Sequence, residues 1–225
     1  MSGLYAMDVT ALEDERRYAR CWEQVPLSRR QRIEHLRQKE DRWRSLGAGW
    51  LLQEVLFRYF GLKSPCLDSL PGGKPVVKDR PYIQFSLTHT GKWAVCAADI
   101  CAIGADAETI QGDRMGIAGR FFTAEEQKSL LSLPSQEERD RAFTCIWTRK
   151  EAFLKYTGEG LRRSLASFSP VCPDTDTVPI WDPALCCYFT AYTLPDGTPL
   201  SLCTQSNCVP ASIAFLQAEG GTQGK

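Results

Sequence analysis

The chain has 225 residues, of which 43% are hydrophobic and 24% are charged, and its 27 lysines and arginines are balanced by 27 aspartates and glutamates. This length allows one domain or two compact halves, and the composition is ordinary for a globular protein with a hydrophobic core. A net charge of zero excludes a general attraction to nucleic acids or anionic membranes, so any such attraction would need a local patch.

The cysteines and the first residues of the chain indicate the cellular compartment in which the protein occurs. Ten cysteines occur without a C-x-x-C pair, and the chain has only two histidines, so zinc-finger spacing is absent. We interpret the cysteines as small buried side chains in a reducing compartment. The first residues lack the cationic start and apolar core of a signal peptide, and no apolar run approaches the ~18 residues that a membrane-spanning helix needs. We therefore expect a cytoplasmic protein that does not bind a membrane.

The first part of the chain predicts a strand, helices and a pair of strands. Ser28 followed by Gln31 is a capping-box pattern, which predicts that a helix begins there. Apolar residues recur at helical spacing up to Gly61, which indicates a long core helix that ends at this glycine. The other expected elements are a strand at 4–9, a helix at 12–22, strands at 82–88 and 93–98, and a turn between these strands.

The second part of the chain predicts a similar series. Glycines between 112 and 119 indicate a looser stretch, and Thr123 with Glu126 forms a second capping-box pattern that predicts a helix through 131. The other expected elements are a strand at 103–108, a long helix at 136–157, strands at 186–194, 200–204 and 212–216, and a glycine-rich tail that frays from about residue 219.

Each part therefore contains a long helix and several strands. From this element order we predict an α+β protein of two similar halves, at residues 1–101 and 102–225.

One stripe of the long helix at 136–157 combines three kinds of side chain. Trp147, Glu151 and Lys155 recur every four residues, so on a helix they point the same way. A carboxylate and an ammonium group one turn apart suit a catalytic site. The same spacing is also that of the commonest surface ion pair on a helix, so this pattern alone leaves both interpretations open.

A pair of carboxylates lies in the strand predicted at 103–108. Asp106 and Glu108 are two residues apart, so both side chains point to one face of the strand. Like charges side by side are unfavourable without a cation, and hard oxygen ligands of this kind suit Mg²⁺. Glu151 could supply a third carboxylate. The alternative for the pair is a solvated strand end.

Basic side chains crowd into residues 29–44. Their guanidinium groups suit phosphate binding, but acidic neighbours in the same segment also fit a solvated helix face. Lys74 and His89 lie in predicted turns, and turn formation alone already explains the glycine and proline residues around them.

Taken together, the carboxylates, the lysine and the separate cations suit transfer chemistry on a phosphate anhydride. The chain has neither a G-x-x-x-x-G-K-[ST] loop nor a G-x-G-x-x-G loop.

Two segments of the chain resemble the paired signature of the Sfp-type 4′-phosphopantetheinyl transferases. GADAE at 104–108 is similar to G-(I/V)-D-(I/V)-E, and WTRKEAFLK at 147–155 is similar to W-x-x-K-E-(A/S)-x-x-K, which follows roughly forty residues later in the family. GKP at 73–75, FSLTHTG at 85–91 and FF at 121–122 also fall in the family's order. The chain departs from the family at Ala105 and Ala107, in place of branched residues, and in having Thr-His-Thr for Ser-His-Ser.

The resemblance implies a pseudo-twofold monomer with its active site between two α+β halves. It implies transfer of the 4′-phosphopantetheine arm from coenzyme A to a serine of an apo carrier protein of a fatty-acid, polyketide or peptide synthetase, with adenosine 3′,5′-bisphosphate as the other product. The implied residues are Asp106, Glu108 and Glu151 for Mg²⁺, Glu151, Lys155 and Lys150 for catalysis, and Arg29, Arg32, Arg44, Lys74, Thr88 and His89 for coenzyme A.

Two other functions use the same residues. A different Mg²⁺-dependent phosphoryl-transfer enzyme or nuclease would turn over nucleotides or nucleic acid without coenzyme A. A non-catalytic module could bind nucleic acid through the basic segment, and its salt-dependent binding would survive loss of Asp106. The zero net charge and the lack of aromatic residues interleaved with that segment count against the second alternative.

Overall fold

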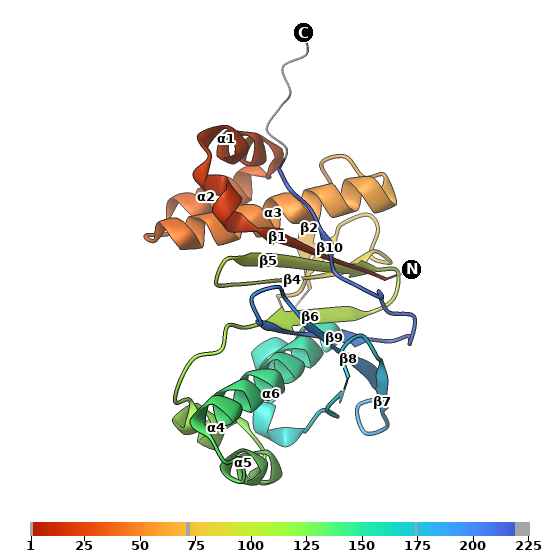
Figure 1. Ribbon diagram of the computed structural model, residues 1–225. Coiled ribbons are helices and arrows are strands. Elements are labelled where there is room, and N and C mark those ends of the chain that lie inside the picture. The colour runs from red at the N-terminus through yellow and green to blue at the C-terminus, as the bar shows by residue number, and fades with distance from the viewer. Residues whose placement is uncertain (1, 71–72, 174, 219–225) are drawn as a thin grey trace.

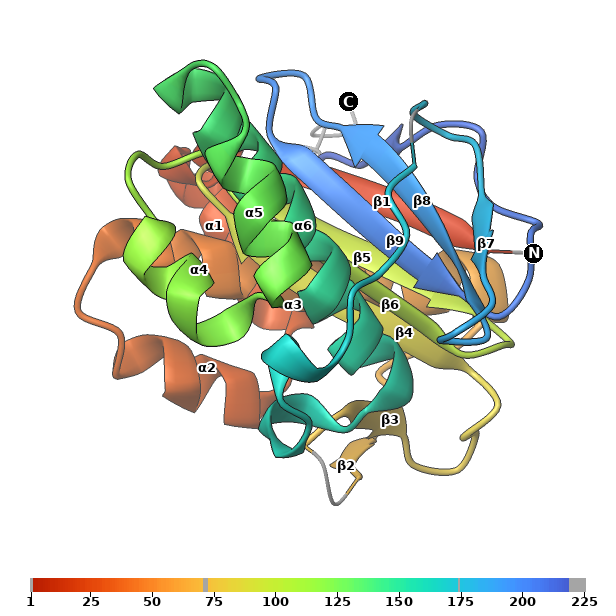
Figure 2. The same cartoon turned by 90° about the horizontal axis from the view of Figure 1, so that it is seen from below.

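The computed structural model describes residues 2–70, 73–173 and 175–218. Within these ranges two sheets lie in the middle of the molecule, with one group of helices outside each sheet (Figures 1 and 2). The tail expected to fray from about residue 219 lies outside the described residues. No helix in the described ranges is long and apolar enough to cross a bilayer.

The first sheet has the strand order β10-β1-β5-β4 and is covered by the long helix α3. β1 is antiparallel to β5, which is antiparallel to β4. The elements of this half are β1 (Gly3–Asp8), the 3₁₀ turn η1 (Val9–Glu13), α1 (Glu15–Gln24), α2 (Leu27–Glu34), α3 (Lys39–Phe60), β2 (Leu67–Ser69), β3 (Pro75–Val77), β4 (Gln84–Thr90) and β5 (Trp93–Asp99).

The second sheet has the strand order β6-β9-β8-β7, all antiparallel, and α6 lies across it (Figure 2). Its elements are β6 (Ile103–Ala107), α4 (Met115–Phe121), α5 (Ala124–Leu131), α6 (Gln136–Thr157), the 3₁₀ turns η2 (Gly160–Arg162) and η3 (Leu165–Ser167), β7 (Ile180–Asp182), β8 (Cys187–Thr193) and β9 (Pro199–Thr204).

The two halves have a similar connectivity. In each half a first strand leads through two short helices to a 22-residue helix and later to a β-hairpin. Before the hairpin, β2 and β3 pair in a small separate sheet in the first half, whereas β7 joins the main sheet of the second half. The second strand of the hairpin pairs with the first strand, which gives the orders β1-β5-β4 and β6-β9-β8. The predicted α+β fold of two similar units is therefore confirmed. One further strand, β10 (Ala214–Phe215), returns from the second half and pairs in parallel with β1.

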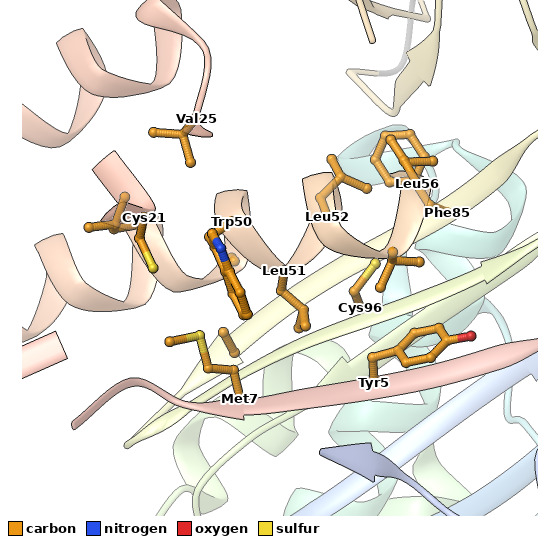
Figure 3. Packing of buried hydrophobic residues seen from close by; sticks show 14 of the residues in the cluster. Tyr5, Met7, Cys21, Val25, Trp50, Leu51, Leu52, Leu56, Phe85 and Cys96 are labelled. Carbon is orange, nitrogen blue, oxygen red and sulfur yellow. The ribbon is translucent and has the colours of Figure 1, made fainter. Parts of the chain in front are cut away.

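Strands in the middle of the molecule have two buried faces. Along β1, Tyr5 and Met7 pack toward α3, whereas Leu4 and Ala6 pack toward the second sheet. This alternation follows from the two-residue period of a strand. Figure 3 shows Trp50 and other side chains of α3 closing over the outer face.

Several sequence predictions differ from the structure. His89, which was expected in a turn, lies inside β4 and pairs with Ala94 of β5. α2 begins at Leu27, so Ser28 lies inside the first turn, where its side chain does not cap the helix. The stretch expected to be loose contains α4. All ten cysteines are free thiols, but only four are buried, namely Cys21, Cys96, Cys187 and Cys203.

Candidate active site

Helix α6 is fixed at both ends by local signals. Ser135 and Glu138 form a reciprocal capping box at its start, and Gly158 ends it with a φ of 74°. The helix also lies very close to β6, because a Cβ atom on Gly104 would be 2.0 Å from the carbonyl oxygen of Ala152. Glycine at this position therefore allows α6 to bring its polar stripe against β6.

Asp106, Glu151 and Lys155 meet at the junction of the two halves. The Lys155 Nζ lies 2.6 Å from Asp106 Oδ1 and donates a hydrogen bond to the carbonyl of Leu87 in β4 at 3.3 Å. Burial raises the pKa of the Glu151 carboxyl, the Asp106 charge raises it further, and Lys155 opposes both effects. A carboxyl group with a raised pKa is better matched to taking a proton near neutral pH.

The other predicted carboxylate, Glu108, has its own partners. Its Oε1 accepts hydrogen bonds from Thr90 and Thr109, each at 3.2 Å, and lies 3.8 Å from the guanidinium of Arg114. In the part of the chain that the structure describes, no three acidic, histidine or cysteine side chains are gathered closely enough to form a ready metal cluster. The structure thus brings Asp106 and Glu151 together and holds Glu108 beside them on a separate set of bonds.

A cleft runs beside these groups between the halves. One pocket of about 260 Å³ is lined by Ser86 and Leu87 of the first half and by Glu151 and Lys155 of the second. A neighbouring pocket of about 400 Å³ is lined by basic side chains of α2, Arg29 and Arg32. Gly73 and Pro75 line both pockets, so the two adjoin. An elongated anionic ligand could therefore reach from the basic side chains to the carboxylates.

At the end of the cleft formed by the first half, cationic side chains repel one another, which lowers their pKa values. The pKa of the Arg29 guanidinium is lowered by burial and then by Arg32. The pKa of His89, a residue that is exposed to solvent in part, is lowered mainly by partial loss of hydration and then by Arg44, with smaller contributions from Lys155 and Arg29. A bound anion would relieve this repulsion, which is the condition expected at a phosphate site.

Comparison with known proteins identifies the family. Residues 102–194 match the model of the 4′-phosphopantetheinyl transferase superfamily. The chain is 31% identical over 199 residues to 4′-phosphopantetheinyl transferase psf-1 of Bacillus pumilus, which covers 87% of this chain and 85% of that protein. It is also 31% identical over 195 residues to 4′-phosphopantetheinyl transferase Sfp of Bacillus subtilis, which covers 85% of this chain and 87% of that protein.

The chain belongs to the Sfp-type 4′-phosphopantetheinyl transferases. A shorter match in this family, 34% identical over 132 residues and covering 55% of each chain, is to 4′-phosphopantetheinyl transferase HetI of Nostoc.

Two lysines of this transferase hold backbone carbonyls. Lys74 lines the pocket, and its Nζ donates to the carbonyls of Ile103 at 3.2 Å and Tyr156 at 3.1 Å. Burial lowers the pKa of Lys74 to about 8. This side chain therefore ties the turn before β3 to both β6 and α6.

Lys150 lies away from the cleft. Its side chain is 0% exposed, and its Nζ is 2.8 Å from Glu126 Oε2 and donates to the carbonyls of Leu165 and Phe168. The sequence signature predicted a catalytic role for Lys150, but an ammonium group enclosed in this way does not reach the groups around Asp106. Its contacts are those of a structural residue that holds the segment after α6.

The carboxylates of this transferase fit a divalent cation. The family uses coenzyme A and is generally Mg²⁺-dependent. Asp106 raises the pKa of Glu151, so the two carboxylates are close enough to repel each other. A cation held by one or two protein carboxylates, water and phosphate oxygens is the arrangement that Mg²⁺ favours, and it would relieve this repulsion.

Sequence reasoning assigned Thr88 to coenzyme A binding but missed its bond to Asp106, and it assigned no role to Ser86 or Thr90. Ser86, Thr88 and Thr90 of β4 all bond to the segment that carries Asp106 and Glu108. The signal was present as hydroxyl side chains at every second position of FSLTHT, which place them on one face of the strand.

Proposed function

We propose that this transferase moves the 4′-phosphopantetheine arm from coenzyme A to a serine of an apo carrier protein and releases adenosine 3′,5′-bisphosphate. The observation that carries the proposal is the meeting of Asp106, Glu151 and Lys155 beside a cleft whose other end is cationic. Phosphoryl transfer needs mainly such positioning and charge neutralisation.

Coenzyme A spans the cleft in this proposal. Its 3′-phosphate and adenosine end bind near Arg29, Arg32, Arg44 and His89, where a dianion relieves the repulsion between cations. Arg44 is supported there by a hydrogen bond to the carbonyl of Gly91 at 2.9 Å. Lys74 and Thr88 line the path of the nucleotide toward Asp106.

The pyrophosphate of coenzyme A lies beside Asp106 and Glu151 in this proposal, with Glu108 as a third carboxylate. These residues would hold Mg²⁺, which supplies neutralisation of the phosphate oxygens when bound. Lys155, already 2.6 Å from Asp106, neutralises charge on the phosphate that is transferred.

Glu151 is the proposed proton acceptor. It takes the proton of the carrier serine hydroxyl, directly or through water, as the serine oxygen bonds to the phosphorus next to the pantetheine arm. The bond from that phosphorus to the bridging oxygen breaks, and its electron pair leaves with adenosine 3′,5′-bisphosphate. Lys150 has no part in this step, because it is enclosed with Glu126.

We further propose a cytoplasmic monomer whose partners are carrier domains of fatty-acid, polyketide or peptide synthetases, and not nucleic acids or membranes. We also propose that the two halves comprise residues 1–101 and 102–225; β10, which follows the second half, pairs with β1 of the first sheet.

Mass spectrometry of apo carriers tests the proposed function. Carriers of the three classes are incubated with the full chain, coenzyme A and Mg²⁺, and a matching panel lacks coenzyme A. The expected result is a gain of one phosphopantetheine mass that requires coenzyme A and a carrier serine. No gain on any carrier, together with turnover of nucleotides or nucleic acid without coenzyme A, would favour the alternative enzyme class.

A further inference from the structure

β4 and β6 are joined by side-chain hydroxyls where a backbone ladder would be expected. β4 is the edge of one sheet and β6 is the edge of the other. Ser86, Thr88 and Thr90 of β4 accept hydrogen bonds from the backbone N–H groups of Ala105 at 2.9 Å, Ala107 at 3.4 Å and Thr109 at 3.0 Å, respectively. Both series advance by two residues, so the hydroxyls set the register between the two halves.

Two of these hydroxyls also donate to the predicted metal ligands. Thr88 Oγ1 donates to Asp106 Oδ1 at 2.9 Å, and Thr90 Oγ1 lies 3.2 Å from Glu108 Oε1, to which it can donate. Ser86 differs, because its hydroxyl lies 3.4 Å from the backbone carbonyl of Ala105. Thr88 and Thr90 are each only 6% exposed, so water cannot readily replace these bonds.

Each carboxylate is held through one of its two oxygens. Within the described residues, the bonds to Asp106 from Thr88 and Lys155 both go to Oδ1. The contacts to Glu108 from Thr90, Thr109 and Arg114 all go to Oε1. One oxygen of each carboxylate is thus fixed by protein donors, whereas the second oxygen accepts no hydrogen bond within the described residues.

We infer that Thr88 and Thr90 are positioning residues that orient Asp106 and Glu108 for a divalent cation while they dock the second half onto the first. This inference rests on the proposed function, because it concerns the same carboxylates. It places the control of carboxylate orientation in the first half of the chain, on the strand that also carries His89.

Manganese binding tests this inference without the transfer reaction. Mn²⁺ affinity is measured by electron paramagnetic resonance on the full chain, with and without coenzyme A, for Thr88→Val, Thr88→Ser, Thr90→Val and Thr90→Ser. The valine variants keep the shape of the side chain and lose the hydroxyl, and we expect them to bind Mn²⁺ about tenfold more weakly, in line with the loss of outer-shell partners of a metal site. The serine variants keep the hydroxyl and should retain most of the affinity.

Ser86→Ala is the matched control for the measurement without coenzyme A, because Ser86 also lines the pocket. It removes a hydroxyl from the same ladder that does not contact a carboxylate, so it should lower the unfolding midpoint but leave Mn²⁺ affinity in the absence of coenzyme A within about twofold of wild type. Wild-type Mn²⁺ affinity in folded Thr88→Val and Thr90→Val, or an equal loss in Ser86→Ala, would overturn the inference, as would a wild-type chain that binds no Mn²⁺. Carrier modification is scored separately, so a chain that modifies no carrier but shows the expected Mn²⁺ pattern would refute only the proposed function.

Discussion

The two long helices carry the same charged pair at the same place, with different outcomes. Glu54 and Glu151 each lie 15 positions after the first residue of their helix, Lys39 or Gln136, and a basic residue follows four positions later in both cases. In α3, Arg58 turns back to Glu54 at 2.8 Å and stays 48% exposed. In α6, Lys155 instead reaches Asp106 on β6 at 2.6 Å.

The difference comes from what faces each helix. Arg58 is half exposed and Glu54 is 19% exposed, and an ion pair near the surface contributes about 0–1 kcal/mol. The equivalent part of α6 lies against β6 and the edge strand β4, so its charges meet Asp106 and become partly buried. Spacing on a helix therefore does not distinguish a surface ion pair from a pair in the proposed active site, whereas a third charged partner does.

Removal of the α6 carboxylate or of its partner should have the largest effect. We expect Glu151→Ala and Asp106→Ala each to lower carrier modification by about 10²-fold or more, because a proton acceptor and a metal ligand are lost. Initial rates by mass spectrometry measure this effect, and circular dichroism checks that the fold is intact. Glu54→Ala is the control at the matching position and should retain wild-type turnover. Comparable rates in Glu54→Ala and Glu151→Ala would remove the distinction between the two helices.

Loss of the α6 ammonium group should have the next largest effect. Lys155→Ala is expected to lower kcat by about 10²-fold and to change the KM for coenzyme A much less, because Lys155 stabilises charge that develops during transfer. Steady-state kinetics with a single carrier separate the two parameters, and Arg58→Ala serves as the control on α3. A change confined to KM would contradict the role given to Lys155.

A smaller effect is expected from the glycines that let each helix approach its sheet. A Cβ atom on Gly104 would meet the backbone of α6, whereas a Cβ atom on Gly47 of α3 would meet the tip of the Val9 side chain at 2.6 Å. Side chains adjust more easily than backbone, so Gly104→Ala should lose about 1–3 kcal/mol of stability and Gly47→Ala less. Urea unfolding of both variants measures the order, and the reverse order would show that α6 can move away from β6.

The smallest effect concerns pH. A carboxyl group whose pKa is higher in the folded chain binds its proton more tightly when folded, so its contribution to stability is present at low pH and is lost as the pH rises through the folded pKa. The pKa of Glu151 is raised, so without metal Glu151→Gln should gain stability over wild type as the pH rises above the ordinary range of a glutamate. Urea unfolding in EDTA at pH 4 and pH 7 tests this. Glu54→Gln, which loses an ion pair to a half-exposed arginine, should show no such gain.

Local signals predicted much of the fold from the sequence. The capping box before α5 and the glycine after α3 act within a few residues, and each occurs where it was expected. The prediction from Ser28 was wrong because α2 already begins at Leu27, with Pro26 at the N-cap position. The paired motif also identified Asp106, Glu151 and Lys155, which the structure brings together.

Features that depend on distant pairings were not predicted. Lys150 belongs to the same signature as Glu151, but the next position on a helix points about 100° away, and Lys150 therefore meets Glu126 of α5. The hydroxyl contacts between β4 and β6, and the pairing of β10 with β1, join segments whose proximity only the tertiary structure fixes. An alternating pattern predicts which side chains share one face of a strand, but it does not predict which segment of the chain that face will contact.

The return of β10 has a consequence for the order of events during translation. β1 is made first and can pair with β5 as soon as the β4–β5 hairpin leaves the ribosome. The other edge of β1 stays open until the chain has been made as far as Phe215. An unpaired edge of this kind can recruit a foreign strand. The nascent first half therefore remains exposed to misassembly throughout synthesis of the second half, and a ribosome stalled after β9 would hold it in that vulnerable state.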